Sequence, residues 1–321
     1  MVCLNTHCAA LKSDQLSGVI KAMELSLSCS DFLNGFDHLD THSVNKNKID
    51  IFSLRINANE FNYSSLQESL VDPLINYSLS RKVKAEYEGK PGTLSLKARE
   101  KFVEYLRNKG ELGELLLYCF LESHLQAPKI LSKLELKTST SHYVNGADGV
   151  HFLKLPDGNF QIIFGESKTE RELTTALSHA FKSIYEFKNE INTKGAKKSG
   201  LPYEKSLISD HLDKETFNLE EKNFIKDIIY PKRDSEFEVD DAFGVFVAYE
   251  LNVDKEDKNL SNSDFRAKMQ KQIKSDISDR VKHITNKILE YDLVGHNFYI
   301  YVVPFTELTK NRRSIQQGIT K

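Results

Sequence analysis

The stretch that decides the fold covers residues 146–168 and reads GADGVHFLKLPDGNFQIIFGESK. Its middle, Pro156–Asn159, has the residue types of a tight turn. The residues on either side, Val150–Leu155 and Phe160–Gly165, are rich in β-branched and aromatic side chains, which favour strands. We therefore predict two neighbouring strands that form a hairpin.

A helical region precedes this hairpin. The apolar residues between Leu96 and Leu125 follow a helical period, and Gly110 is expected to break the region into two pieces. The second piece, Glu111–Leu125, is apolar nearly all round, so we expect it to be buried. A further strand is expected within Lys129–Thr138.

Helices and strands also follow the hairpin. Thr169 and Glu172 fit a capping box, which predicts a helix that begins immediately after Lys168. The later elements expected from the pattern are a helix over Leu219–Tyr230, a strand over Ala242–Leu251, a helix over Ser263–Tyr291 and a strand over Asn297–Pro304. This order predicts an α/β fold with a central mixed β-sheet flanked by helices.

The beginning of the chain differs from the remainder. Residues 1–92 contain many Ser and Asn, with one strand expected at Ile49–Ile56. The pair Pro91-Gly92 then breaks the chain. We predict an N-terminal extension, residues 1–92, followed by one domain, residues 93–321. Our hypothesis for the extension is a cap that docks a partner.

Composition limits the class of protein. The chain has 321 residues, of which 40% are hydrophobic and 28% charged, as in ordinary globular proteins. Its apolar runs are shorter than the roughly 18–20 residues of a membrane span, and no secretory signal is visible. The four cysteines have neither CxxC nor zinc-site spacing, so we expect a reduced, cytoplasmic setting. A net charge of −2 does not by itself indicate a nucleic-acid binder.

Charged residues stand at the two ends of the hairpin. Asp148 enters the first strand, and Glu166 and Lys168 end the second. Side chains alternate along a strand, so Glu166 and Lys168 should share a face while Ser167 points away. A hairpin places the start of one strand beside the end of the next. Asp148 should therefore approach Glu166.

Two carboxylates and a lysine at this position favour a magnesium site. Mg²⁺ takes oxygen ligands, commonly one or two carboxylates. The ion would acidify a water, and Lys168 would hold that water or stabilise charge on a phosphate. Each residue also has a structural explanation, because Asp148 suits a turn and Glu166 with Lys168 suits a surface salt bridge. The ordered combination favours the metal site.

These residues resemble the motif of the PD-(D/E)xK restriction-endonuclease-like nucleases, whose core is a helix, three strands, a helix and a strand. Asp148 matches the aspartate of the motif, Glu166 its acidic position and Lys168 its lysine. Ala147 stands where proline is usual. The backbone carbonyl of Ser167 is a further expected ligand. Mn²⁺ is an alternative to Mg²⁺.

The same resemblance implies a metal-binding glutamate on the first core helix. Glu114 is the best match, and Glu111 is a rival. The structural alternative is that the exposed first turn of a helix favours acidic residues in general.

A closer resemblance is to the HamA-like nuclease subunit of the Hachiman antiphage defence system. The stretches that resemble this family are Gly113–Glu122, Gly146–Phe152, Phe164–Lys168 and Asn297–Pro304. The resemblance implies a bacterial DNA nuclease that a superfamily 2 helicase, HamB, restrains until the helicase senses aberrant DNA.

Two other functions stay open. The first is a non-catalytic adaptor that binds DNA or a helicase, and the second is an RNA nuclease or nucleotide-directed hydrolase with the same site. The sequence has no Walker lysine loop, so ATP use must belong to a partner. The oligomeric state does not follow from the sequence.

Overall fold

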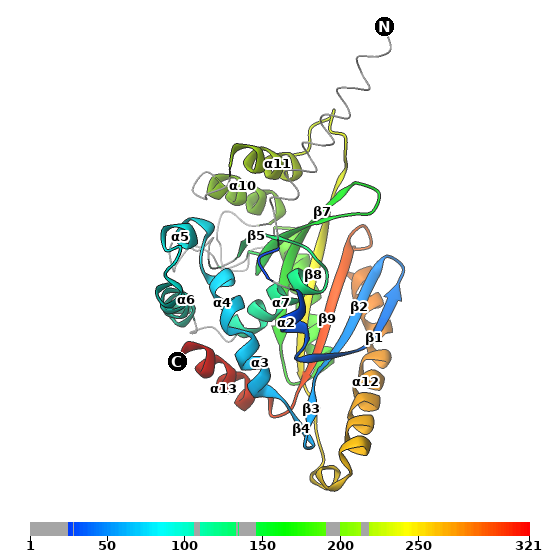
Figure 1. The fold of residues 1–321 in the computed structure, drawn as a ribbon. Helices are drawn as coiled ribbons and strands as arrows, with labels where there is room; N and C mark the ends of the chain where they lie inside the picture. Colours follow the sequence, from blue (N-terminus) through cyan, green and yellow to red (C-terminus); the bar gives the residue numbers. More distant parts are fainter. Residues whose placement is uncertain are drawn as a thin grey trace.

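The structure is a computed structural model that describes residues 25–27, 29–105, 110–132, 134, 146–190, 200–212 and 218–321. Its centre is a seven-stranded sheet with the strand order β1-β2-β9-β8-β7-β6-β5 (Figure 1). The strands are β1 Phe36–Val44, β2 Asn47–Leu54, β5 Lys129–Ser132, β6 Gly149–Lys154, β7 Phe160–Thr169, β8 Val239–Glu250 and β9 Asn297–Phe305. The β2–β9, β9–β8 and β8–β7 pairs are parallel and the others antiparallel. The predicted mixed α/β sheet is therefore confirmed.

Helices lie on both faces of this sheet (Figure 1). They are α2 Cys29–Leu33, α3 Tyr63–Ser69, α4 Val71–Ser78, α5 Arg81–Glu86, α6 Pro91–Tyr105, α7 Glu111–Ser123, α9 Leu173–Lys188, α10 Leu201–Leu212, α11 Leu219–Ile229, α12 Asn262–Glu290 and α13 Leu308–Thr320. A short 3₁₀ helix, Lys255–Asn259, and a small second sheet of β3 Ile56–Asn57 and β4 Glu60–Phe61 complete the described elements. Among the described helices, none combines the length and the apolar character needed to span a bilayer.

Helix α7 is buried along its whole length, as its sequence predicts. All 13 of its residues are buried. Two glycines of the sheet allow it to lie close: a Cβ at Gly165 of β7 would be 3.0 Å from Leu117 Cδ2, and one at Gly244 of β8 would be 2.9 Å from Leu121 Cδ2. The helix therefore packs directly on β7 and β8, with its first turn towards the end of the hairpin.

The predicted hairpin is confirmed as β6 and β7. Val150 pairs with Phe164 and Lys154 pairs with Phe160. In the turn, Gly158 has a φ of 91°, a backbone conformation that favours glycine. The turn residues thus fix the register that aligns the other end of the hairpin.

The helix after the hairpin begins later than predicted, and the predicted capping box is wrong. Thr169 is still paired with Ala248 in the ladder, and the Glu170 N–H donates to the Ala248 carbonyl at 3.1 Å. Helix α9 begins at Leu173, and Glu172 at its N-cap makes no side-chain capping hydrogen bond. Pairing with β8 keeps Thr169 and Glu170 extended. The helix therefore cannot begin at the position that the capping pattern predicts.

The N-terminal part of the chain contributes to the central sheet. The strand predicted at Ile49–Ile56 is present as β2, which pairs in parallel with β9. Strand β1, which the sequence pattern did not indicate, pairs with β2 at the edge of the sheet. Helices α10 and α13 were also not predicted. The boundary at residue 92 stays a prediction about domains, but the sheet itself contains strands from both sides of it.

Candidate active site

Asp148 closes the end of the hairpin. Its own N–H donates to the Gly165 carbonyl at 2.8 Å, so pairing extends one residue beyond β6. Its Oδ2 accepts hydrogen bonds from the Ser167 N–H at 2.8 Å and from the Ser167 hydroxyl at 2.9 Å. The residue is only 8% exposed. The N–H groups of a strand lie in the plane of the sheet and usually donate to carbonyls of the neighbouring strand. At the end of this ladder, the Asp148 carboxylate accepts the Ser167 N–H in place of such a carbonyl.

Ser167 lies between this carboxylate and helix α7. A Cβ placed on Gly113 of α7 would be 3.3 Å from Ser167 Oγ, so the serine side chain faces the helix. The N–H and carbonyl of one strand residue point towards the same neighbouring strand. The Ser167 carbonyl, the expected ligand, is therefore directed to the side on which Asp148 lies.

Glu166 and Lys168 form an ion pair on the other face of β7. The Lys168 ammonium donates to Glu166 Oε1, and both side chains are partly buried. Phe164, two residues earlier on the same face, contacts Phe187 of α9 with ring centroids 5.6 Å apart. The alternation predicted for the triplet is thus present, with Ser167 turned towards α7 and its two neighbours towards the α9 side.

The hairpin places the two halves of the predicted site at one of its ends. Val150 is opposite Phe164, and the pairing is regular along the hairpin. Regular pairing ends at Val150 and Phe164, and beyond it the Asp148 N–H donates to the carbonyl of Gly165, one residue short of Glu166. The hairpin thus brings Asp148 and Glu166 to the same end, with the Asp148 carboxylate beside Ser167 on the α7 side and Glu166 on the α9 side. Their approach to one metal ion stays a prediction.

Glu114 extends from α7 into the region of Asp148. It is 6% exposed, and its Oε2 accepts a hydrogen bond of 3.0 Å from the Tyr77 hydroxyl of α4. Glu114 and Asp148 both line one small pocket, together with Gly165 and His151. The alternative of an exposed helix turn does not apply to Glu114, because the residue is buried.

The pKa of Tyr77 depends on the same carboxylates. Burial raises the pKa of Tyr77 well above its usual value, and the charges of Glu114 and Asp148 raise it further. The phenol therefore stays protonated and acts as a donor. Glu111, the rival of Glu114, is also buried and also raises the pKa of Tyr77. Both glutamates thus remain candidates for the acidic contribution of α7.

The donor chemistry of this region fits a hard divalent cation. Glu114 and Asp148 offer carboxylate oxygens from the walls of one pocket, and the Ser167 carbonyl is directed to the same side of β7. Mg²⁺ binds such oxygen donors and keeps several waters. Lys129 also lines this pocket, so a positive side chain is near the two carboxylates.

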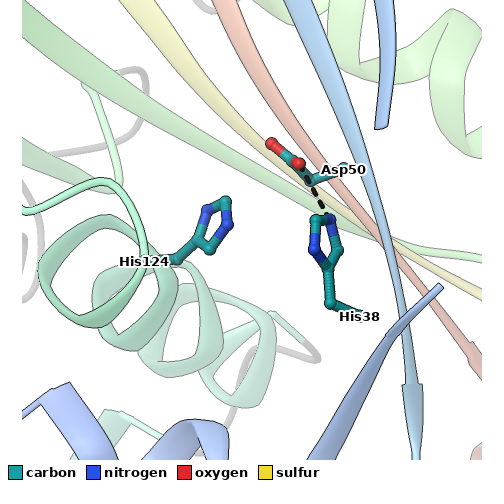
Figure 2. Close-up of side chains that lie close together, drawn as sticks. All are labelled: His38, Asp50 and His124. Atoms are coloured by element: carbon teal, nitrogen blue, oxygen red, sulfur yellow. Dashed lines mark hydrogen bonds and ion pairs between the residues drawn. The ribbon is translucent and has the colours of Figure 1, made fainter. Parts of the chain in front are cut away.

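A second polar cluster lies at the other end of α7, and the sequence pattern did not indicate it. Figure 2 shows His38 of β1, Asp50 of β2 and His124, the C-cap residue of α7, close together. Within the described part of the chain, these residues offer three potential metal ligand atoms that all lie within 4.8 Å of one another. Burial lowers the pKa of His124, an effect that Asp50 opposes and His38 strengthens.

Other polar side chains near the candidate site contact neighbouring residues. His179 is exposed and contacts Glu170 at 3.1 Å, and Lys182 pairs with Glu186 at 3.7 Å on the same helix. His151 is buried, and its Nδ1 lies 2.9 Å from the Ala127 carbonyl.

Comparison with known proteins gives one family. The model of the HamA family matches residues 30–319, a range that includes the whole central sheet, α7 and both polar clusters. No curated protein matches the chain.

Proposed function

This chain belongs to the HamA family, and from that premise we propose that it is a metal-dependent DNA nuclease of the Hachiman antiphage defence system, restrained by a superfamily 2 helicase partner. The supporting observation is the hairpin, which brings Asp148, on the α7 side of β7, and the Glu166–Lys168 pair, on the α9 side, to the same end. These are the three positions of the PD-(D/E)xK motif. The substrate and the partner rest on the family resemblance.

We assign metal binding to Asp148 and Glu166, with Glu114 and the Ser167 carbonyl as further ligands. Mg²⁺ suits this oxygen set, and Mn²⁺ is the alternative. When bound, the ion supplies an acidified water and neutralises charge on the scissile phosphate. The two hydrogen bonds from Ser167 both go to Asp148 Oδ2, and we assign Oδ1 to the metal. Hydrogen bonds of this kind fix the orientation of a ligating carboxylate.

Lys168 supplies a positive charge at the same end of β7. Its ammonium is held by Glu166 on the face opposite Ser167. In this position it would orient the attacking water and stabilise negative charge that develops on the phosphate. Tyr77, whose phenol stays protonated, holds Glu114 by its hydrogen bond and thereby positions the carboxylate.

The central experiment is a cleavage assay with the full chain, alone and with its partner helicase. Plasmid DNA and Mg²⁺ are incubated with the wild type, Lys168→Ala, Glu166→Gln and Lys182→Ala. Lys182 is the matched control, since it is a lysine on the next helix whose ion pair, within the part of the chain that the structure describes, is with the surface residue Glu186. We expect the first two variants to lose about 10²-fold or more in rate, and the control to retain activity. Equal cleavage by all four proteins would refute the assignment.

A panel of substrates separates the alternatives. Duplex DNA, single-stranded DNA, RNA and nucleotides are each offered with Mg²⁺, with Mn²⁺ and with a chelator. Cleavage of RNA or nucleotides but not DNA would replace the proposed substrate. Binding of DNA or helicase without cleavage under any of these conditions would favour the non-catalytic adaptor.

A further inference from the structure

We propose that His38, Asp50 and His124 form a second metal site, for a divalent transition ion such as Zn²⁺ (Figure 2). The site is separate from the proposed magnesium site. Glu114 and His124 lie at opposite ends of α7, whose 13 residues span about 20 Å. The proposal does not depend on the nuclease assignment.

The strand register places the carboxylate of the site. Asp50 pairs with Thr41 of β1 on one side and with Tyr301 of β9 on the other. Residues paired in this way share a face of the sheet, and Tyr301 identifies that face, because its ring stacks on Phe120 of α7 at 5.0 Å. Asp50 therefore points towards α7, and it is only 5% exposed.

A β-bulge brings His38 to the same face. In a regular strand, His38 and Thr41 are three positions apart and would point in opposite directions. The register shifts between His38 and Asp40, and the extra residue restores both side chains to the α7 face. His42, which follows Thr41, points the other way and lies 3.3 Å from Ser278 of α12.

The distances are close to those of a coordination sphere. His38 Nε2 lies 3.0 Å from Asp50 Oδ1. Two ligands at about 2.0–2.1 Å from a tetrahedral Zn²⁺ are about 3.3 Å from each other. The rings of His38 and His124 have centroids 5.4 Å apart. Small changes in side-chain torsion would thus bring the three ligand atoms around one ion.

Neighbouring hydroxyl groups orient two of the ligands. The Thr41 hydroxyl donates to Asp50 Oδ1 at 2.6 Å. The Tyr301 hydroxyl lies 3.3 Å from His124 Nδ1, which assigns Nε2 of that ring to the ion. Hydrogen bonds that orient ligating histidines and carboxylates are typical of protein metal sites.

The ligand types select the class of ion. Two imidazoles and one carboxylate suit Zn²⁺, Fe²⁺, Cu²⁺ or Ni²⁺ better than Mg²⁺, which takes oxygen ligands. Three protein ligands leave a position for water, as in zinc sites that are not purely structural. The His38 side chain is 41% exposed, so solvent reaches the site. The ion would link the β1–β2 hairpin to the helix that carries Glu114.

The test measures metal binding to the full chain, stripped first with a chelator. Zn²⁺ content after dialysis is compared for the wild type, His38→Ala, Asp50→Asn and His42→Ala. We expect the wild type and His42→Ala to retain one zinc more than the other two proteins. His42 is the control because it lies on the same strand but faces α12. All other histidines and the cysteines are common to the four proteins, so zinc that they bind cancels in the comparison.

A second readout is the Co²⁺-loaded protein. Visible absorption of bound Co²⁺ and a rise in melting temperature with Zn²⁺ are expected for the wild type and for His42→Ala, and not for His38→Ala. Circular dichroism establishes that each variant is folded. Equal zinc content in wild type and His38→Ala, or an equal melting shift with Zn²⁺ in these two proteins, would overturn the proposal.

Discussion

At the scale of single residues, the hydrogen bonds of Ser167 matter most for the candidate site. Its N–H and its hydroxyl both donate to the same oxygen of Asp148. The N–H is part of the main chain and survives any substitution except proline. The hydroxyl can be removed alone, which makes its contribution measurable.

We predict that Ser167→Ala weakens Mg²⁺ binding by about 10- to 100-fold, the usual effect of removing an orienting partner of a ligand. The fold should be unchanged, since the N–H bond to Asp148 remains. The measurement is the Mg²⁺ concentration that gives half-maximal cleavage. Ser43→Ala, at an exposed position of β1, is the control and should show no change. A Ser167→Ala variant with the Mg²⁺ response of the wild type would contradict the assignment of Asp148.

A second residue-scale prediction concerns Tyr77 and pH. The folded protein raises the pKa of Tyr77 above that of the unfolded chain, so the phenol is protonated more readily in the folded state. Its contribution to stability is therefore complete below the ordinary tyrosine pKa of about 10, and is lost as the pH rises from there towards the folded-state value. In Tyr77→Phe this part of the pH dependence should be absent.

The measurement is the free energy of unfolding of wild type and Tyr77→Phe between pH 8 and pH 11, by denaturant titration. At neutral pH the variant should also be less stable by about 1.5–3 kcal/mol, because a hydrogen bond to the buried Glu114 carboxylate is removed. Other buried tyrosines contribute equally to both proteins. Parallel pH profiles for the two would show that Tyr77 is not the titrating group.

At the scale of elements, the position of α7 depends on two glycines beneath it. Gly165 and Gly244 let the helix lie directly on β7 and β8. Leu117 and Leu121, the side chains that fill this space, belong to the same helix as Glu114. The packing of the helix on the sheet and the placement of its acidic first turn are therefore coupled.

We predict that Gly244→Ala destabilises the protein by about 1–3 kcal/mol, as overpacking of a buried interface usually does. The added Cβ would lie 2.9 Å from Leu121 Cδ2 and 3.2 Å from Ile163 Cγ2. Denaturant unfolding measures the change. Gly295→Ala is the control, because a Cβ there meets nothing within 4 Å. Equal stability of the two variants would show that α7 is free to shift.

At the scale of the whole molecule, one sheet joins the beginning and the end of the chain. Strand β2 pairs with β9, and its residues Ile49 and Ile51 are completely buried. The family match begins at residue 30 and therefore also includes β1 and β2. Strands from both sides of the predicted boundary at residue 92 therefore belong to this one sheet.

We predict that a chain beginning at residue 93 does not fold cooperatively. Its β9 would lose β2, one of its two parallel neighbours, and the apolar surface under β2 would be exposed to water. Circular dichroism and thermal unfolding of the truncated protein test this expectation, with a chain beginning at residue 25 as the control. A truncated protein that unfolds in one sharp transition would instead support an independent domain.

The sequence by itself determined the local features of this protein. The hairpin from Gly149 to Thr169 follows from turn residues and β-branched runs, and the buried helix α7 follows from its apolar composition. The alternation of Glu166, Ser167 and Lys168 is also a property of any strand. These features depend on neighbours in the chain, so a pattern in the sequence predicts them.

Only the tertiary structure decided the features that depend on distant pairing. The ladder with β8 keeps Thr169 extended and delays the next helix. The bulge in β1, the register of β2 against β9 and the end of α7 together bring His38, Asp50 and His124 to one place. A shift of one residue in the pairing of a strand moves each of its side chains to the opposite face of the sheet. No periodicity in the sequence carries that information, because it arises when separate elements pack together.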